Sequence, residues 1–368
     1  MKVFCEGLDL ADAVLKVSRA AGSKVTGGNL DVIKIAATGD SLVLTATDTE
    51  LTLEKTIKAN VSLDGEFLIS TKIFPDFIKK LTKNQIEMVL LNDNELKIRY
   101  DENESIFQVF QTTGFPQVAE VSENNSFVMI QTELKQIIEK TAFCAATEDS
   151  NPLLKSVYFA IEESLVSAVA IDGQRLALCK KPVKKAIKPC NVIVPSKTIK
   201  EIYALLEDKN EDITVYVENK FIKIKSDNLI LVSRLIEGEY IKYRGMIKDN
   251  LPISILVNRK KFLESLERID ILNSSASALG RSVVKLEIKE KQINLISSSD
   301  ITSARETIVC EMAGKDTVIA FNCRYLIEAL KNISSETVKI YLETPTAPAV
   351  FTPGAQEELL YLILPMRI

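Results

Sequence analysis

Few residues of this chain could carry out catalytic chemistry. Its 368 residues include no histidine, so a Ser-His-Asp triad, a Cys-His nucleophile and metal sites that need imidazole are all excluded. The six cysteines form no C-x-x-C pair and are spread through the chain at Cys5, Cys144, Cys179, Cys190, Cys310 and Cys323. We therefore expect reduced core thiols, no metal site and no cofactor.

The glycines and carboxylates offer no recognisable site either. The sequence has no G-x-x-x-x-G-K-[ST] loop, and Gly27-Gly28 lacks the spacing of a dinucleotide site. Glu162 and Glu163 are sequence neighbours, so on a strand their side chains would face opposite sides. The sequence therefore predicts no catalytic residues. An α+β enzyme that uses carboxylates and a divalent metal is the alternative, and it requires a convergent Asp/Glu cluster.

Basic residues gather on segments that we expect to be helical. Examples are Lys16 and Arg19 in one segment and Lys197 and Lys200 in another, whereas acidic residues concentrate in turns and at strand edges. If equivalent helices point the same way, their basic faces would line one surface that attracts phosphate without reading bases. For any single lysine, a solvated helix face is the simpler interpretation. The net charge of −4 would then describe an acidic rim around a basic surface.

The elements that must position these residues occur three times along the chain. An apolar strand runs into a short helix at residues 67–81, 192–206 and 318–330. Aligned on Ser70, Pro195 and Asn322, these segments lie 125 and 127 residues apart. Upstream, a β-rich run that ends in aspartate recurs at spacings of 124 and 128, at Asp48, Asp172 and Asp300. A repeated unit of about 123 residues explains both sets of spacings.

A third recurring feature is a helix opened by a good N-cap residue, at Asp9, Thr132 or Asn258. After Asn258, the spacing of Phe262, Leu266 and Ile269 predicts one apolar helix face. The fold class that we predict is α+β, with three tandem domains that each pack two helices on antiparallel sheets. The predicted domains cover residues 1–121, 122–249 and 250–368.

The sequence predicts no membrane segment. No apolar stretch reaches the roughly 18 residues that a spanning helix needs. The first residues, Met1-Lys2-Val3-Phe4, begin no apolar signal region. We therefore expect a cytoplasmic protein.

Four segments carry a family resemblance. The segment 170–178 reads A-I-D-G-Q-R-L-A-L and is similar to an A-T-D-G-H-R-L-A motif, and 364–368, L-P-M-R-I, is similar to a closing M-P-M-R-L. Segments 192–197 and 237–244 stand where two further motifs belong. With these motifs, the chain resembles the bacterial sliding clamps, the β subunits of the DNA polymerase III holoenzyme, over its whole length.

This resemblance implies a head-to-tail homodimer that closes a ring of six domains around duplex DNA and tethers the polymerase. A scaffold that binds proteins only is the rival interpretation. The residues implied to face DNA are Lys24, Lys79, Lys135, Lys197, Lys200 and Arg268. The residues implied for the dimer interface are Phe107, Val109, Ile271 and Leu272.

The resemblance also implies an apolar pocket that accepts short linear motifs. The expected partners are the polymerase III α subunit, the δ subunit of the clamp loader complex, and other DNA polymerases and repair proteins. The implied pocket residues are Leu154, Gly173, Arg175, Leu176, Ile241, Met246, Asn322, Tyr325, Thr346, Pro348, Leu362, Ile363, Pro365, Met366 and Arg367. Three positions depart from the family pattern: Gln174 stands in place of His, Ile241 in place of Pro, and Gly245 in place of a larger residue.

Overall fold

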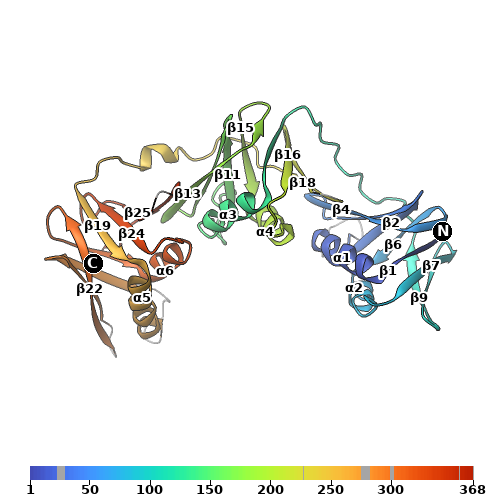
Figure 1. Cartoon of the computed structure of the whole chain (residues 1–368), viewed down its shortest axis with the longest axis horizontal. Helices are drawn as coiled ribbons and strands as arrows, with labels where there is room; N and C mark the ends of the chain where they lie inside the picture. The colour runs from blue at the N-terminus through green and yellow to red at the C-terminus, as the bar shows by residue number, and fades with distance from the viewer. Residues whose placement is uncertain (23–29, 227, 275–281, 299–301, 356, 368) are drawn as a thin grey trace. The chain divides into compact units, whose positions relative to one another are not determined.

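The computed structural model describes residues 1–22, 30–226, 228–274, 282–298, 302–355 and 357–367. The chain divides into two compact units. Figure 1 shows its helices and strands. Unit 1 comprises 1–131, 184–188 and 200–235, and unit 2 comprises 132–183, 189–199 and 236–368. Each unit is built on one antiparallel sheet with helices, so the predicted α+β class is confirmed.

The sheet of unit 1 runs in the order β14-β10-β16-β17-β18-β4-β3-β2-β6-β9-β8-β7-β1-β5. Its strands are β1 (Lys2–Glu6), β2 (Val32–Thr38), β3 (Ser41–Thr47), β4 (Leu51–Lys58), β5 (Asn60–Leu63), β6 (Gly65–Ser70), β7 (Gln85–Asn92), β8 (Glu95–Tyr100), β9 (Asn103–Phe110), β10 (Ser126–Ile130), β14 (Lys185–Ala186), β16 (Asp212–Glu218), β17 (Phe221–Ser226) and β18 (Leu229–Arg234). Neighbouring strands in this order are hydrogen-bonded, so strands distant in sequence share one sheet.

The sheet of unit 2 runs in the order β15-β11-β12-β13-β26-β25-β24-β19-β22-β21-β20-β23. Its strands are β11 (Ser156–Ile161), β12 (Leu165–Ile171), β13 (Arg175–Pro182), β15 (Cys190–Pro195), β19 (Ile253–Asn258), β20 (Val283–Lys289), β21 (Gln292–Ser298), β22 (Ser303–Ala313), β23 (Thr317–Asn322), β24 (Thr337–Leu342), β25 (Ala349–Pro353) and β26 (Leu359–Ile363).

Six α-helices are found in the described part of the chain, two for each predicted repeat. They are α1 (Gly7–Val17), α2 (Phe74–Ile78), α3 (Gln131–Ala142), α4 (Ser196–Leu205), α5 (Arg259–Ser274) and α6 (Cys323–Lys331). Two short 3-10 helices add η1 (Ser18–Ala20) and η2 (Tyr243–Met246). Within unit 2, α5 and α6 pack side by side (Figure 1).

Two of the three predicted N-caps were wrong. The helices α1 and α3 begin at Gly7 and Gln131, directly after a strand, so Asp9 and Thr132 lie inside their first turns. No loop separates these helices from the strands before them, so the end of the strand, and not a capping side chain, sets the first residue of each helix. Asn258 is confirmed, because its side-chain Oδ1 accepts a hydrogen bond from the Lys261 amide at 3.0 Å.

The periodicity of apolar residues accounts for the core. On α5, Phe262, Leu266 and Ile269 are all fully buried, which confirms the predicted apolar face. On β19, the buried Ile255 and Val257 alternate with residues that point away from the core, the period of two that a one-sided sheet needs. Fully burying one such side chain contributes roughly 1.5–3 kcal/mol.

Two strand pairs join consecutive repeats with the same register. At the first junction β4 pairs with β18, from Leu51 opposite Ser233 to Lys55 opposite Leu229. At the second junction β13 pairs with β26, from Arg175 opposite Ile363 to Cys179 opposite Leu359. The repeat spacing that relates Asp48 to Asp172 also relates Leu51 to Arg175. Both junctions therefore use one backbone arrangement.

The same backbone hydrogen bonds follow each junction. At the last residue of β18 the Arg234 amide donates to the Glu50 carbonyl at 2.8 Å, and directly after β26 the Leu364 amide donates to the Gln174 carbonyl at 2.9 Å. Two residues later, the amides of Ile236 and Met366 donate to the carbonyls of Ile193 and Ala320, at 2.9 and 2.8 Å. These equivalences confirm the repeat that the sequence predicts.

Candidate functional site

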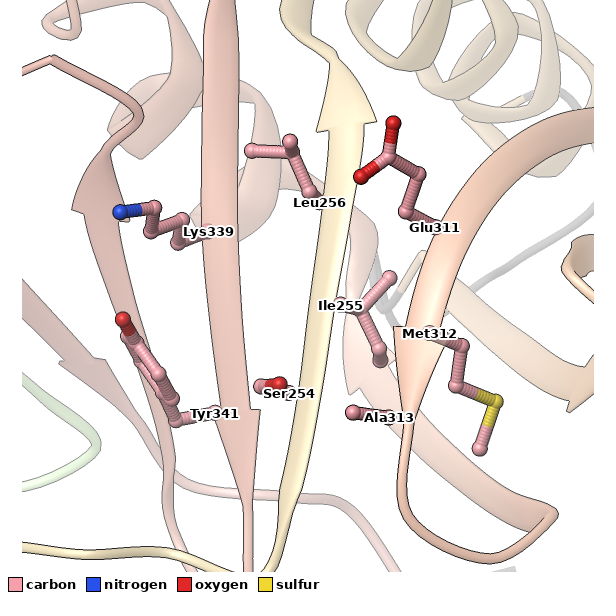
Figure 2. A pocket seen from close by; sticks show the side chains of 8 residues that line it. All are labelled: Ser254, Ile255, Leu256, Glu311, Met312, Ala313, Lys339 and Tyr341. Atoms are coloured by element: carbon pink, nitrogen blue, oxygen red, sulfur yellow. The ribbon is translucent and has the colours of Figure 1, made fainter.

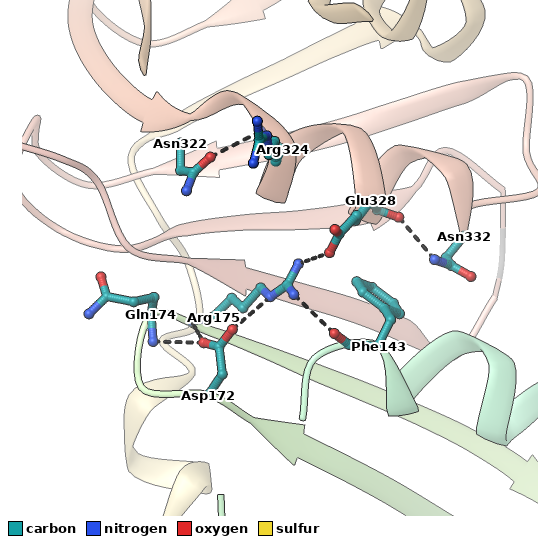
Figure 3. Close-up of polar contacts among 8 residues, drawn as sticks. All are labelled: Phe143, Asp172, Gln174, Arg175, Asn322, Arg324, Glu328 and Asn332. Atoms are coloured by element: carbon teal, nitrogen blue, oxygen red, sulfur yellow. Dashed lines mark hydrogen bonds and ion pairs between the residues drawn. The ribbon is translucent and has the colours of Figure 1, made fainter. Parts of the chain in front are cut away.

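The turn between β12 and β13 is organised by Asp172. Its Oδ1 accepts hydrogen bonds from the amides of Gln174 and Arg175, both at 2.9 Å (Figure 3). Gly173 between them has φ +87°, a conformation that glycine adopts without steric cost. The aspartate and glycine of the sequence motif therefore shape the turn that presents Arg175.

The Arg175 guanidinium is the centre of a buried polar cluster. Its Nε donates to Asp172 Oδ2 at 2.9 Å, its Nη2 donates to the Phe143 carbonyl at 2.9 Å, and its Nη1 donates to Glu328. Figure 3 shows these partners converging on it from β12, α6 and the end of α3. The Arg175 side chain is 9% exposed, so little of it can reach an incoming ligand.

Two aromatic rings enclose the guanidinium. Its central carbon lies 4.4 Å from the Tyr325 ring centroid and 5.4 Å from that of Phe143, within cation–π range. Burial raises the pKa of the Tyr325 hydroxyl. Burial also raises the pKa of the nearby Cys144 thiol, which therefore stays protonated and unreactive. The cluster suits rigid support better than proton transfer.

An apolar cluster lies beside this polar one. It joins the predicted pocket residues Leu176 and Leu362 to Tyr243, and Leu154 and Ile241 pack against it. Tyr240 and Tyr158 stack over the same cluster, with ring centroids 4.9 Å apart and planes 7° apart. Such a surface can hold aliphatic or aromatic anchors of a peptide.

The rim of the site is more exposed than its floor. Met246 is 44% exposed, Thr346 is exposed, and Pro348 is half-buried. Asn322 caps α6, because its Oδ1 accepts a hydrogen bond from the Arg324 amide at 3.1 Å. Its role here is therefore to hold the helix that carries Tyr325.

The C-terminal tail is tied down at its backbone. Ile363 is buried at the end of β26, while Pro365 and Met366 are half-buried and Arg367 is exposed. The amides of Leu364 and Met366 are both hydrogen-bonded, so the tail's side chains are presented from a fixed backbone. The predicted pocket residues thus fall into a buried floor, a half-buried tail and an exposed rim, all within unit 2.

The three departures from the family pattern sit at the edge of this site. Gln174 is exposed, and its side chain points away from Arg175 (Figure 3). Ile241 packs against the apolar cluster. A Cβ added to Gly245 would meet no atom within 4 Å, so the space that a larger residue would fill is open. The departures change the border of the site and leave its floor in place.

Four residues that hold the site together were missed at the sequence level. Phe143 and Glu328 contact Arg175, and the buried Lys140 forms an ion pair with Glu357 on the approach to β26. Burial lowers the pKa of Lys140. The repeat could have indicated one of them, since Glu328 follows Glu201 by the 127 residues that separate Asn322 from Pro195.

The residues expected to face DNA differ in exposure and in the ion pairs that they form. Lys79, Lys197 and Lys200 are exposed at helix ends or surfaces, and Lys135 on α3 is half-buried. Lys24 lies outside the described residues. Arg268 is 57% exposed and donates two hydrogen bonds to Glu306 at 2.6 and 2.5 Å, which lower the pKa of that carboxyl.

Other basic residues on the helices are engaged within unit 1. Lys16 of α1 forms ion pairs with Asp12 at 3.1 Å and with Glu207 at 3.3 Å. Arg19 of η1 pairs with Glu201 of α4 at 2.5 Å. These two side chains therefore link one repeat to the next at the first junction, a role that the sequence did not suggest.

The residues expected at the dimer interface also differ in exposure. Ile271 is 68% exposed and Leu272 is 37% exposed on the last turn of α5. Phe107 is half-buried against the rings of Phe74 and Phe77. Val109 is 1% exposed, so its side chain belongs to the core and only its strand could meet a partner. The outward residues of β9 are instead Ile106, 57% exposed, and Phe110, 47% exposed.

A separate depression of about 390 Å³ lies on the sheet of unit 2 (Figure 2). It is lined by residues of β19, β22 and β24: Ser254, Ile255, Leu256, Glu311, Met312, Ala313, Lys339 and Tyr341. None of these is a predicted site residue. Elsewhere, no cluster of three or more metal-ligating side chains is found among the residues that the structure describes, nor any helix able to cross a membrane.

Comparisons with known proteins decide the family. Models of the N-terminal, central and C-terminal domains of the DNA polymerase III beta subunit match residues 1–119, 129–242 and 246–367. The chain belongs to the DNA polymerase III beta subunit family. Members of this family are sliding clamps, which are processivity factors and non-catalytic subunits. The predicted family and the predicted non-enzymatic function are therefore confirmed.

Individual relatives agree with this assignment over the full chain. The chain is 29% identical to the beta sliding clamp of Halalkalibacterium halodurans, over 95% of each sequence. A putative DNA polymerase III beta subunit from Eubacterium rectale superimposes with a TM-score of 0.95 at 29% identity, covering 100% of both chains. The sliding clamp of Bacillus subtilis does so with a TM-score of 0.95 at 26% identity, covering 100% of this chain and 99% of that one. The family's three clamp domains are present throughout.

Proposed function

We propose that two copies of the chain join head to tail in a closed ring that encircles duplex DNA and tethers the replicative polymerase. The observation that carries this proposal is the repeated junction. Each of the first two repeats is joined to the next by the same antiparallel strand pair, β4 with β18 and β13 with β26. The third repeat has an equivalent strand that meets no strand of a further repeat among the described residues, and we propose that a second copy supplies its partner.

The repeat spacing defines the strands of this third junction. Ser303 follows Asp300 by three residues, as Leu51 follows Asp48 and Arg175 follows Asp172. The first part of β22 is therefore the equivalent of β4 and β13. The partner strand follows from the same comparison. Phe110 pairs with Leu68 of β6, and Met366 donates a backbone hydrogen bond to Ala320 of β23, so Phe110 is the repeat equivalent of Met366. Residues 103–107 of β9 are therefore the equivalent of β26.

Both of these strands have one edge without a partner strand in the described chain. β22 pairs with β21 from Ser303 to Val309 and with β19 only from Cys310 to Ala313, so the first part of the strand is paired on one side. β9 pairs with β8 from Asn103 to Gln108 but with β6 only at its last two residues. Pairing the two free edges between copies would remove both from solvent and would close the assembly after two copies.

The helices support the same closure. On the repeat spacing, Ile271 of α5 is the equivalent of Arg19 and Phe143. Arg19 pairs with Glu201 of the next repeat, and Phe143 stacks on the cluster that holds Glu328 of the next repeat. Ile271 would accordingly contact the first repeat of a second copy, where Phe107 and its neighbours are apolar.

We further propose that the predicted domains 1–121, 122–249 and 250–368 are the units of this ring, and that it acts in the cytoplasm. The floor, tail and rim described above would bind short motifs from the polymerase α subunit, the clamp loader δ subunit, other polymerases and repair proteins. The exposed Lys79, Lys197 and Lys200 suit a sliding contact, which must be weak and independent of sequence.

The register of the third junction can be tested by crosslinking. The repeat places Ala304 opposite Ile106 of the second copy, so the double variant Ile106→Cys/Ala304→Cys should join two copies through a short bis-thiol reagent. Light scattering should then give about 82 kDa, twice 40.9 kDa. The matched control is Ile106→Cys/Val309→Cys. Val309 is exposed and lies about 17 Å from Ala304 along the same strand.

Efficient crosslinking of the control, or a species of only 40.9 kDa at micromolar concentration, would contradict the proposed ring.

The pocket is tested separately. Deleting 364–368 should abolish polymerase stimulation while leaving the dimer intact, because the tail follows the paired strand. Loss of the dimer as well would mean that the tail is needed for folding instead of for binding.

A further inference from the structure

We propose that Glu328 is a positioning residue of the peptide-binding pocket, although it is not among the predicted pocket residues. It would hold the Arg175 guanidinium so that the turn at Asp172 keeps the C-terminal tail in place. This inference rests on the proposed function of the pocket and adds a residue and a mechanism to it.

The first step is the contact between α6 and the turn. Arg175 is 9% exposed, and of its three hydrogen-bond partners in the described chain only Glu328 comes from the last repeat, while the Tyr325 ring of the same helix covers the guanidinium. Glu328 is 45% exposed, so it reaches the cluster from the surface side. Because Arg175 carries one positive charge between two carboxylates, each carboxylate fixes one edge of its planar guanidinium.

The second step links the turn to the tail. Gln174, next to Arg175, accepts the Leu364 amide hydrogen bond through its carbonyl. Without Glu328 the guanidinium would keep Asp172 and the Phe143 carbonyl but lose its hydrogen bond to α6, so the turn and its Gln174 carbonyl could shift relative to the last repeat. The second tail bond, from the Met366 amide to Ala320, lies within the last repeat and does not involve the turn.

The third step comes from the equivalent position in the first junction. There Glu201 also accepts an ion pair from an arginine of the preceding repeat, but that arginine is Arg19, after α1. The position equivalent to Arg175 is Leu51, which is 1% exposed and carries no charge. The acid is thus kept at both junctions, and only at the second does it act on the turn beside the chain end.

The test compares Glu328→Ala with the matched control Glu267→Ala. Glu267 is also a half-exposed glutamate whose ion pair is made to α6, through Lys331 at 2.8 Å. Two quantities are measured on the intact protein. One is the Kd of a fluorescein-labelled hexapeptide with a leucine and a phenylalanine as apolar anchors, and the other is residue-resolved amide hydrogen exchange of the tail.

We expect Glu328→Ala to weaken peptide binding about fivefold, the size of one charge-assisted hydrogen bond discounted for exposure. Exchange should accelerate at the Leu364 amide and stay unchanged at Met366. Glu267→Ala should change neither quantity. Glu328→Gln keeps the shape and one acceptor oxygen, so it should give a smaller effect in the same direction, and it serves if the alanine variant unfolds.

Three results would overturn the proposal. Weaker peptide binding with unchanged Leu364 exchange would mean that Glu328 contacts the peptide directly. Equal acceleration at Leu364 and Met366 would mean that the last repeat had loosened as a whole, and unchanged binding with unchanged exchange would mean that Glu328 is a surface ion pair only. Failure of the unmodified protein to bind the hexapeptide would instead count against the proposed pocket itself.

Discussion

The two junctions between repeats share a backbone and differ in their side chains. Both have an aspartate that caps a turn, a five-residue antiparallel ladder and two following amide hydrogen bonds. At the first junction the residue after the turn is the buried Leu51, and the chain continues beyond β18. At the second it is Arg175, and the chain ends nearby in an apolar tail.

This difference indicates how a repeated scaffold acquires a single binding site. The backbone supplies the same frame twice, so the frame alone does not make a pocket. The proposed pocket needs the charged cluster that fixes the turn, the apolar floor of Leu176 and Leu362, and the half-buried tail of residues 364–366. Only the second junction combines these three features.

Equivalent lysines at the two junctions form ion pairs that differ in burial. Lys16 of α1 pairs with Asp12 and Glu207, carboxylates that are each 47% exposed. Its repeat equivalent, Lys140 of α3, is 8% exposed and pairs with Glu357. Tyr361 also donates a hydrogen bond from its hydroxyl to the Lys140 carbonyl at 3.0 Å. Removing one partner of the ion pair should therefore lower the free energy of unfolding more at the second junction than at the first.

The largest effect should come from exchanging the residues that distinguish the junctions. Leu51→Arg buries a charge at the first junction while Glu201 is still paired with Arg19, and it should lower the free energy of unfolding by about 3–5 kcal/mol. Adding Arg19→Phe recreates the arrangement of the second junction, with Asp48 and Glu201 as carboxylate partners, and should recover part of the loss. Urea titration measures both; no recovery in the double variant would break the proposed equivalence of the junctions.

A smaller loss is expected for Glu357→Gln, which leaves the buried Lys140 ammonium without its carboxylate. We expect about 2 kcal/mol at pH 7 by denaturant unfolding. The neighbouring Glu358, 67% exposed and paired with Lys180 at 3.1 Å, is the control, and Glu358→Gln should cost less than about 0.5 kcal/mol.

The Glu357→Gln defect should also depend on pH. Burial lowers the pKa of Lys140 in the folded protein, so the unfolded chain binds that proton more tightly. Stability of the variant should therefore rise as the pH rises toward about 10.4, the pKa of a free lysine side chain. A defect that is constant from pH 7 to pH 10 would show that Lys140 does not cause it.

Arg175→Leu tests the opposite exchange at the second junction. Removing the guanidinium frees the turn at Asp172 and the tail bond at Gln174, so peptide binding should weaken by about tenfold or more. Fluorescence polarisation with the hexapeptide measures this loss, and light scattering should show an unchanged dimer. Full binding by this variant would mean that the arginine is not what distinguishes the second junction.

The smallest effect is expected at Glu207 of the first junction. Hydrogen bonding from Lys209, and then from Lys16, lowers the pKa of its carboxyl. The stabilisation is present above the unfolded pKa of about 4.3 and is lost as the pH falls through the lower folded value. Glu207→Gln should therefore cost less than about 0.5 kcal/mol at pH 7, and this cost should shrink as the pH falls below about 4.3. A cost that does not shrink as the pH falls would have another origin.

Much of the fold could be predicted because it repeats. Landmarks such as Asp48 and Asp172 recur at one spacing, and apolar periodicity located the core face of α5. The helix starts at Gly7 and Gln131 could not be predicted, since these helices follow strands directly and no capping residue marks them. Contacts such as Arg175 with Glu328 join residues 153 positions apart, and no local pattern encodes that approach.

The candidate site was predicted unevenly for a related reason. Apolar residues of the floor follow from the family motif, and the structure groups them in one cluster. Exposure and pairing could not be read from the motif. Val109, expected at the dimer interface, has a buried side chain, and Arg268, expected to face DNA, forms an ion pair with Glu306. Burial and pairing depend on neighbours from other strands, which a single segment does not show.

The central claim is that two copies close a ring whose hold on DNA is topological. Its most direct test is to load the protein onto nicked circular DNA with a clamp loader and ATP, and then to linearise the circle. The account predicts that the protein stays on the closed circle and is released when the DNA is cut. Retention on the linear DNA after cutting would contradict a sliding ring.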